Sequence, residues 1–139
     1  MEIIANAVQT VAAGQNVQFT DTVTCGTCSI NHRAGSGLIT IKGNTNQCRA
    51  RYKITFGGNI AIPTGGTVEA IQIAIAVDGE AIPSTTMIVT PAAVEEYQNV
   101  FSAIFLDVPR GCCMTISVRN TTTQNVEIQN ANLIIERVA

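Results

Sequence analysis

The stretch from Thr67 to Gly79 has the longest apolar strand pattern in the chain. Read at a period of two residues, one face carries Ile71, Ile73, Ile75 and Val77, and the other carries Val68, Ala70, Gln72, Ala74 and Ala76. A strand of an antiparallel sheet normally keeps one polar face, so small apolar residues on a second face indicate that something covers it closely. We therefore expect Ala70, Gln72, Ala74 and Ala76 to face a partner chain or an overlying layer.

The rest of the chain also has strand patterns. Asp78-Gly79 is a two-residue hairpin signal, so Glu80–Thr90 is expected to return as the partner strand. Residues 48–56 alternate apolar and polar side chains, Gly57–Gly66 has a loop composition, and Pro91–Asn99 suits a loop or a single helical turn. In Val126–Val138 the apolar residues change from one face of the strand to the other, as a bulge near Asn130 would cause.

About eight to ten strands with little helix predict an all-β chain. We expect residues 1–139 to form one antiparallel jelly-roll β-sandwich.

Composition supports assembly and excludes some partners. The hydrophobic fraction is 46% and the charged fraction is 13%, against about 25% charged residues in a typical soluble domain. The mean hydropathy is +0.26. So few charges would solvate the surface of a monomer poorly, which favours a homo-oligomer. The net charge of −2 and the pI of about 5.2 give no reason to expect nucleic acid or an anionic membrane as partner.

The N-terminal residues lack a basic segment followed by a sustained apolar run, and no stretch of about 18 apolar residues occurs. We expect a soluble chain made in the cytoplasm. Five cysteines in such a chain suit free thiols or metal ligands better than a disulfide framework, and the odd number leaves at least one unpaired within a monomer.

One group of residues has the chemistry of a metal site. Cys25, Cys28 and His32 are closely spaced, and Cys48 follows sixteen positions after the histidine. Thiolate and imidazole ligands could hold a tetrahedral zinc ion, although a second close ligand pair is missing. A disulfide formed after release from the cell and simple structural thiols are the alternatives, and the last is favoured because Cys48 is in phase with the core face of its strand. We expect no cofactor and no metal.

Two further groups have an ordinary structural explanation. The adjacent residues Cys112 and Cys113 should face opposite sides of a strand, where packing is favoured over a bond to a neighbouring subunit. Arg49, Arg51 and Lys53 form a basic stripe that could hold a phosphate or glycan. A solvated or subunit-facing strand surface is favoured instead, with acidic residues of a neighbour as partners (Glu69, Glu95 or Glu96).

Catalytic chemistry is not indicated. The single histidine and the aspartates in turns or at strand ends give no set of nucleophile, base and orienting acid, and no glycine-rich phosphate loop opens a helix. Asn120-Thr121-Thr122 fits the glycosylation pattern, but a polar turn is favoured in a chain without an export signal. We expect no enzyme.

From Gly37 onward the order of signals resembles a known family. The segments that carry the resemblance are, in order, GLITIKG, RARYKITF, IQIAIAVDGE, FLDVPRG, TISVRN and a closing apolar strand. Their order is similar to that of the strands in the globular-head jelly roll of the tumour necrosis factor and complement superfamily. It is most similar to the short bacterial and bacteriophage members of that superfamily. The resemblance covers about residues 35–138. It implies a ten-stranded sandwich that forms a compact trimer and serves in binding or in building surfaces.

The chain is expected to be a short single domain without a collagen-like stalk or an export signal, and in this it resembles components of bacteriophage particles. The first hypothesis is therefore a homotrimeric decoration protein or fibre head, made in the host cytoplasm, on the surface of a virion, with the capsid shell as partner. The second is a carbohydrate- or receptor-binding trimer on a bacterial or spore surface, contacting a glycan through loops such as Gly43–Gln47 and Gly57–Gly66. The third is a zinc-stabilised cytoplasmic oligomer.

Overall fold

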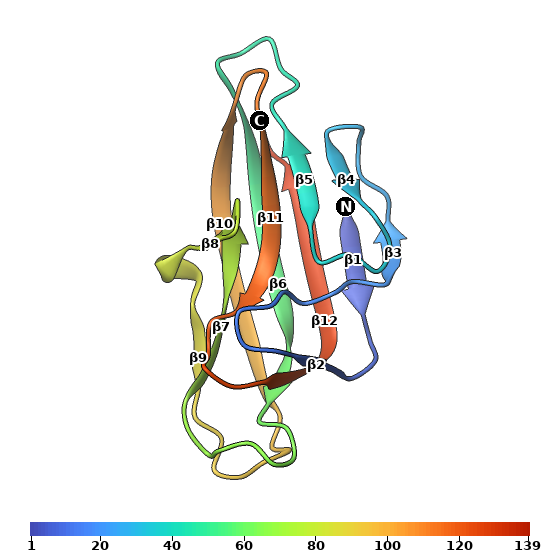
Figure 1. Cartoon of the computed structure of the whole chain (residues 1–139). Helices are drawn as coiled ribbons and strands as arrows, with labels where there is room; N and C mark the ends of the chain where they lie inside the picture. The colour runs from blue at the N-terminus through green and yellow to red at the C-terminus, as the bar shows by residue number, and fades with distance from the viewer.

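The computed structural model describes all 139 residues and shows two antiparallel sheets packed face to face (Figure 1). Sheet A has the order β10-β6-β12-β1-β3, with β2 also paired to β12, and sheet B has the order β4-β5-β11-β7-β8, with β9 also paired to β7. The strands are β1 (Glu2–Ala5), β2 (Gln9–Val11), β3 (Asp21–Thr24), β4 (Ile30–His32), β5 (Ile39–Lys42), β6 (Arg49–Ala61), β7 (Ile71–Val77), β8 (Glu80–Ala81), β9 (Met87–Val89), β10 (Gln98–Pro109), β11 (Cys113–Asn120) and β12 (Val126–Arg137). The single helical turn is a short 3-10 segment, η1 (Pro83–Thr85). The predicted all-β jelly roll is confirmed.

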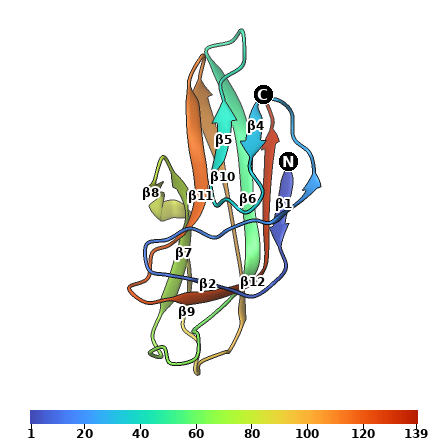
Figure 2. The same cartoon turned by 45° about the vertical axis from the view of Figure 1, so that its right-hand side comes forward.

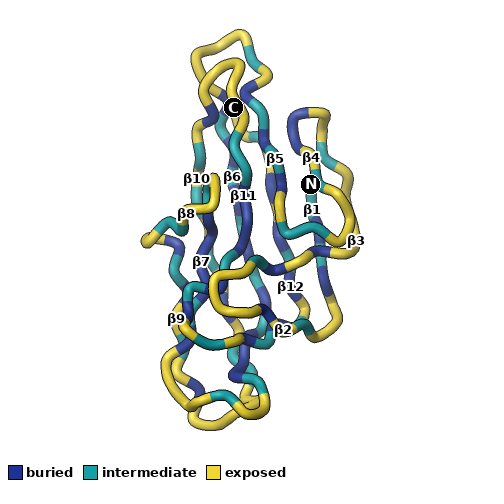
Figure 3. The backbone as a smooth tube through the Cα atoms, viewed as in Figure 1, coloured by how far each residue is buried: buried dark blue, intermediate teal, exposed yellow.

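The core lies between the two sheets, where every second residue of the long strands points inward. Figure 2 shows the two layers from the side, and Figure 3 shows buried backbone along the strands and exposed backbone at both loop ends. One cluster of 27 buried apolar residues fills this space. Its largest side chains include Tyr52, Phe19 and Phe56, all fully buried. The Tyr52 hydroxyl donates to the carbonyl of Lys42, so the phenol brings no unpaired polar group into the core.

Strand β6 is longer than its composition predicts. Two glycines at Gly57 and Gly58 indicate a loop, yet the strand continues to Ala61. The reason lies on the neighbouring strand, where Asn130 has a φ of 55° and the β6–β12 register shifts between Gln129 and Asn132. A Cβ atom at Gly58 would lie 3.4 Å from the Cα atom of Ala131. The predicted bulge near Asn130 is confirmed, and the glycine pair lets it approach β6.

Strand β7 is shorter than predicted and is followed by a broken partner. It begins at Ile71, and Asp78 and Gly79 both have positive φ, as a type I′ turn requires. The predicted single return strand from Glu80 to Thr90 is wrong, because η1 separates β8 from β9. The segment Pro91–Glu96 between β9 and β10 forms turns and bends without a helix.

The chain itself covers the second apolar face of β7. Ala74 and Ala76 are 0% exposed, so they have no surface left for a partner chain, whereas Ala70 is exposed and precedes the strand. Arg119 of β11 lies opposite Ala74, and its guanidinium donates to the carbonyl of Gly79 at 2.7 Å. The side chain must therefore run along the outer face past Ala76. The sequence predicted that either a partner chain or an overlying layer covers this face. The overlying layer covers Ala74 and Ala76, so a partner chain at this face could contact only Ala70 and Gln72.

The N-terminal chain crosses from sheet A to sheet B between β2 and β3. Gly14 and Val17 donate backbone hydrogen bonds to Asn120 and Val118 of β11. The side chain of Asn120 is fully buried, donates to the carbonyls of Val11 and Gln124, and accepts from the N–H of Thr122. A buried amide with all its hydrogen bonds made cannot accept a glycan in the folded chain, so its role is to hold the β11–β12 turn.

Candidate functional site

The outer face of sheet A carries exposed aromatic side chains. Phe101 and Phe105 of β10 are 65% and 60% exposed. Cross-strand pairing places them in one layer with residues of β6 and β12. We define the apolar face as Phe101, Ala103, Phe105, Thr55, Gly57 and Ile134. Because two of only four phenylalanines lie in water here, this is the most conspicuous exposed patch of the molecule.

Polar groups border the apolar face at both ends of the strands. At one end Asp107 accepts two hydrogen bonds from Arg51, at 2.8 and 3.2 Å, and lies 3.0 Å from Nε of Arg49. The hydrogen bonds from Arg51 hold the pKa of Asp107 below its usual value, and Arg49 acts in the same direction. At the other end the amide of Asn99 donates to the side chain of Asn59. An apolar centre with a polar border is the anatomy of a protein interface.

The basic stripe therefore has a partner within its own chain. Its two arginines share Asp107 of the adjacent strand β10, and no neighbouring subunit is needed to supply a carboxylate. Lys53 lies in register between Phe105 and Glu136 on the outer face. The stripe borders the apolar face, and whether its surface is solvated or faces a subunit stays a prediction.

The sequence contained the signal for the apolar face. Phe101, Ala103 and Phe105 alternate with Ser102, Ile104 and Leu106, so β10 is largely apolar on both faces. The same pattern in β7 predicted that a partner chain or an overlying layer covers Ala74 and Ala76. Periodicity detects a strand with two apolar faces but does not show which of those faces the chain covers itself.

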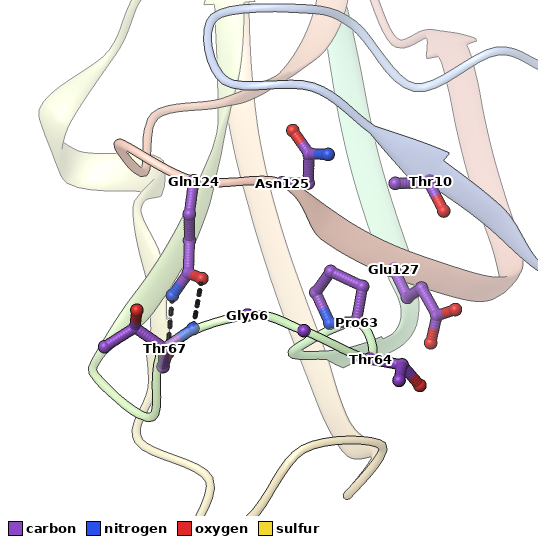
Figure 4. Close-up of a pocket in the computed structure, with 9 residues that line it drawn as sticks. Thr10, Pro63, Thr64, Gly66, Thr67, Gln124, Asn125 and Glu127 are labelled. Atoms are coloured by element: carbon purple, nitrogen blue, oxygen red, sulfur yellow. Dashed lines mark hydrogen bonds between the residues drawn. The ribbon is translucent and has the colours of Figure 1, made fainter.

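A polar hollow of about 600 Å³ lies at the end of the sandwich opposite the β10–β11 turn (Figure 4). Its lining contains no hydrophobic side chain and comprises Thr10, Pro63, Thr64, Gly65, Gly66, Thr67, Gln124, Asn125 and Glu127. Gln124 fixes the wall by accepting from the N–H of Thr67 at 3.0 Å and donating to its carbonyl at 2.8 Å. The hollow belongs in part to the predicted ligand-binding loop Gly57–Gly66.

Two glutamates and a tyrosine stand beside this hollow. Glu95 accepts from the N–H and the hydroxyl of Thr64, at 3.0 and 2.9 Å, and Tyr97 donates to Glu127 at 3.1 Å. Burial and a hydrogen bond with Glu95 raise the pKa of Glu127, whereas hydrogen bonds with Glu127 and Thr64 lower the pKa of Glu95. The pKa values of the two carboxyl groups are therefore shifted apart, and Glu127 keeps its proton to a higher pH than Glu95 does. Burial and Glu127 also raise the pKa of Tyr97 to about 12.

The predicted zinc ligands are not assembled. Cys25, Cys28 and His32 line one open hollow of about 660 Å³, but no group of three His, Cys, Asp or Glu side chains could hold a metal ion. Nε2 of His32 donates to the carbonyl of Ser36 at 2.9 Å, and its ring packs edge-on against Phe19. Cys48 lies in another loop, where its carbonyl accepts from Arg110.

All five cysteines are exposed free thiols. The favoured structural roles, with Cys48 in the core and Cys112 and Cys113 packed, are therefore wrong. Cys48 precedes the first residue of β6, and Cys112 precedes the first residue of β11, so strand periodicity does not apply to either. The structure contains no helix that is long and apolar enough to span a membrane.

The comparison with solved structures identifies the fold. The globular domain of the zebrafish complement 1qA protein has a TM-score of 0.64 and 10% sequence identity, covering 96% of this chain and 93% of that chain. The chain has a complement-type jelly-roll fold. This confirms the resemblance read from the order of the strands at the level of fold, while the bacteriophage subgroup stays a prediction.

Other solved structures are less similar. Pika GITRL has a TM-score of 0.41 and 14% identity, with 95% of this chain and 98% of that chain covered. A family 35 carbohydrate-binding module from Clostridium thermocellum has a TM-score of 0.36 and 16% identity, with 96% and 91% covered. No protein-family model matches the chain, and no curated protein matches its sequence.

Proposed function

We propose that this chain is a non-enzymatic head domain that assembles into a homotrimer through the outer face of sheet A. The apolar face carries this proposal, because Phe101 and Phe105 are both at least 60% exposed in the single chain. Burying an aromatic side chain of this size contributes on the order of 2 kcal/mol. The low charged fraction supports assembly as well. The number of three copies comes from the resemblance to tumour necrosis factor and complement heads.

The mass of the reduced protein in solution tests this assembly. We expect a particle of three times the 14.7 kDa chain mass, measured by light scattering after size-exclusion chromatography. The double variant Phe101→Thr/Phe105→Thr should be a folded monomer by circular dichroism. Ile88→Thr is the matched control, because Ile88 is 62% exposed on β9 of the other sheet, and it should stay trimeric. A monomeric wild type, or a double variant that remains trimeric, would exclude this interface.

We assign the trimer to the surface of a bacteriophage particle, as a decoration protein or fibre head that contacts the capsid shell and acts by shape and adhesion. The small single domain and the resemblance to short bacteriophage members support this assignment. Genes that flank the coding sequence provide the test. Neighbours encoding capsid, portal or terminase proteins would agree with a virion role, whereas neighbours encoding spore-coat or surface proteins would contradict it.

The polar hollow favours a second function, a carbohydrate-binding trimer on a bacterial or spore surface. Its hydroxyl, amide and carboxylate groups match the hydrogen-bonding capacity of sugars. Thr10 and Asn125 are exposed and make no side-chain hydrogen bond within the chain, so they are free to contact a ligand. Glycan-array binding that is lost in Thr10→Val/Asn125→Ala and kept in the surface control Thr123→Val would support it. Binding at background level would exclude it.

A further inference from the structure

The two ends of the sandwich carry opposite charge. The end with the β5–β6 loop and the β10–β11 turn holds six of the eight lysines and arginines against two carboxylates, Asp107 and Glu136. We call it the basic end, and its cations are Lys42, Arg49, Arg51, Lys53, Arg110 and Arg137. None of these six residues is buried. Positive charge is therefore concentrated at one end of a chain whose net charge is −2.

Hydrogen bonds between separate segments hold the basic end together. The guanidinium of Arg137 in β12 donates to the carbonyl of Asn44 in the β5–β6 loop at 2.8 Å. The N–H of Arg110 in the β10–β11 turn donates to the carbonyl of Cys48, directly before β6, at 3.0 Å. Lys42 is the last residue of β5. Cations from four segments of the chain thus meet at this end.

The opposite end is acidic. It is formed by the β6–β7 loop, the segment between β9 and β10 and the start of β12, and residues 62–70, 90–98 and 121–127 include no lysine or arginine. Glu95 accepts from the N–H of Thr64 at 3.0 Å, which joins the first two segments at the end opposite the β10–β11 turn (Figure 1). We call this the acidic end, and its carboxylates belong to Glu69, Glu95, Glu96 and Glu127.

The two ends are too far apart to neutralise each other within one chain. Strand β6 runs between them and has 13 residues. That length corresponds to about 40 Å, several times the screening length of about 8 Å at physiological salt. The only ion pairs of the chain join Asp107 to Arg49 and Arg51. The other four cations of the basic end and all four carboxylates of the acidic end therefore have no ionic partner.

The basic end already shows which chemical group it binds. Arg51 donates two hydrogen bonds to the carboxylate of Asp107, at 2.8 and 3.2 Å, and Nε of Arg49 lies 3.0 Å from the same carboxylate. Arginine suits carboxylates because its planar fork makes such paired, charge-assisted hydrogen bonds. Three of the four glutamates of the acidic end are exposed. A second copy of this chain therefore offers the basic end both the opposite charge and the matching group.

We propose that the basic end of one copy binds the acidic end of the next, so that copies add end to end along the long axis of the sandwich. The apolar face lies on the side of the sandwich, so both ends stay free in the proposed trimer and the contact does not depend on it. A contact that joins two different surfaces without closing into a ring continues as an open row. Trimers joined in this way form a column, which suits the fibre role proposed above.

The first measurement is the mass of the full-length protein by light scattering, with reductant present so that the exposed thiols cannot cross-link. In about 0.02 M salt the mass should rise with protein concentration, and in about 0.5 M salt, where charges are screened within a few ångströms, it should settle at that of one particle. A mass that does not respond to salt or concentration would overturn the proposal. Whether the particle in high salt is a trimer or a monomer tests the proposed function separately.

Two charge-reversed variants locate the contact. Lys42→Glu/Arg110→Glu brings the cations and carboxylates of the basic end into balance, and Glu69→Lys/Glu96→Lys does the same at the acidic end. Each variant alone should stay a single particle in low salt. An equal mixture should form pairs of particles and stop there, because one variant keeps only the acidic end and the other only the basic end. Circular dichroism verifies that each variant is folded.

Asp21→Lys/Glu80→Lys is the matched control, because it changes the net charge as Glu69→Lys/Glu96→Lys does but at exposed residues of β3 and β8, away from both ends. It should associate like the wild type. A control that stays single, or a mixture that forms no pairs, would overturn the proposal. A wild type that stays single in low salt and binds immobilised heparin instead would overturn it in favour of an anionic polysaccharide at the basic end.

Discussion

The hydroxyl group of Thr85 fills a gap in the hydrogen-bonding edge beside Ile75. Thr85 Oγ1 accepts from the N–H of Ile75 at 3.0 Å and also contacts the carbonyls of Ile75 and Ile82, at 3.2 and 2.7 Å. Strand β7 pairs with β8 at one end of this edge and with β9 at the other. A single side chain thus satisfies the backbone of β7 where the partner strand is interrupted.

Thr85→Val should destabilise the domain without changing its shape. Valine keeps the volume of threonine but leaves the N–H of Ile75 without a partner in a site where Thr85 is 1% exposed, while the carbonyl of Ile75 still accepts from the N–H of Ile82. Leaving a buried group unsatisfied costs about 1 to 3 kcal/mol. Urea unfolding followed by circular dichroism measures the change. The control is Thr90→Val at an exposed position, and equal unfolding midpoints for the two variants would contradict the bridging role.

Ala74→Glu should unfold the domain, not merely weaken assembly. Ala74 is 0% exposed beneath the chain's own outer layer, so a glutamate there would bury an unpaired charge or force that layer open. We expect a loss on the order of several kcal/mol, seen as little or no folded protein by circular dichroism. Ala70→Glu, at the exposed position before β7, should fold normally. A folded Ala74→Glu variant would mean that the covering layer is absent.

Glu127→Gln should flatten the dependence of stability on pH. The pKa of Glu127 is raised, so its contribution is fully present below the unfolded value and is lost as pH rises through the folded value. The pKa of Glu95 is lowered, so its contribution is present above the unfolded value and is lost as pH falls through the folded value. Glutamine does not titrate, so the variant should lack the loss on the alkaline side of the ordinary value of 4.5.

Thermal unfolding between about pH 3 and pH 8 measures this effect. The wild-type midpoint should fall as pH rises above the ordinary glutamate value of 4.5. The fall should be no more than a few degrees because the pair is largely solvated, and the variant should lack it. Tyr97 and Thr64, the other polar groups at the pair, do not titrate in this range. Glu80→Gln is the control at an exposed carboxyl. Parallel curves for wild type and Glu127→Gln would contradict the raised pKa of Glu127.

Gly43→Ala should disrupt the end of the sandwich that carries the cysteines. A Cβ atom on Gly43 would lie 2.1 Å from the carbonyl oxygen of Pro109, which is closer than any real contact. The β5–β6 loop and the β10–β11 turn would have to separate, at a cost of about 1 to 3 kcal/mol. Gly57→Ala provides a matched control within a strand, because its nearest neighbour would be at 3.8 Å. Urea unfolding of both variants gives the comparison, and equal stability would contradict the close approach.

Local patterns in the sequence predicted much of the fold. The alternation of β6, the positive φ values at Asp78-Gly79 and the phase slip near Asn130 are all properties of short segments, which is why they could be read directly. The role of the glycine pair in β6 could not be predicted from its own segment, because the pair makes room for a bulge on β12, a strand about seventy residues later in the chain. Contacts between segments that are distant in sequence determine whether such glycines lie in a strand or a loop, and these contacts cannot be seen in a single sequence.

The candidate sites were less predictable for the same reason. Thr64, Tyr97 and Glu127 come from three separate segments and meet only in the folded chain. The β3–β4 loop and the β10–β11 turn are far apart in sequence, yet both make backbone hydrogen bonds with Lys42 or Gly43 at the end of β5. Close spacing instead predicted a ligand set of Cys25, Cys28 and His32, which the folded chain does not assemble into a metal site.

The positions of the two termini determine how the domain would carry a mechanical load. The amino group of Met1 donates to the carbonyl of Ile135 at 2.6 Å, and the N–H of Arg51 donates to the carbonyl of Ala139. Both termini lie toward the same end of the sandwich (Figure 1). Strands β1 and β12 are antiparallel neighbours, so tension between the termini would open their ladder one hydrogen bond at a time. Tension between one terminus and the opposite loop end would shear many bonds at once. In single-molecule pulling we expect the second geometry to withstand the larger force, so a particle that holds this domain by one terminus would use its stronger direction.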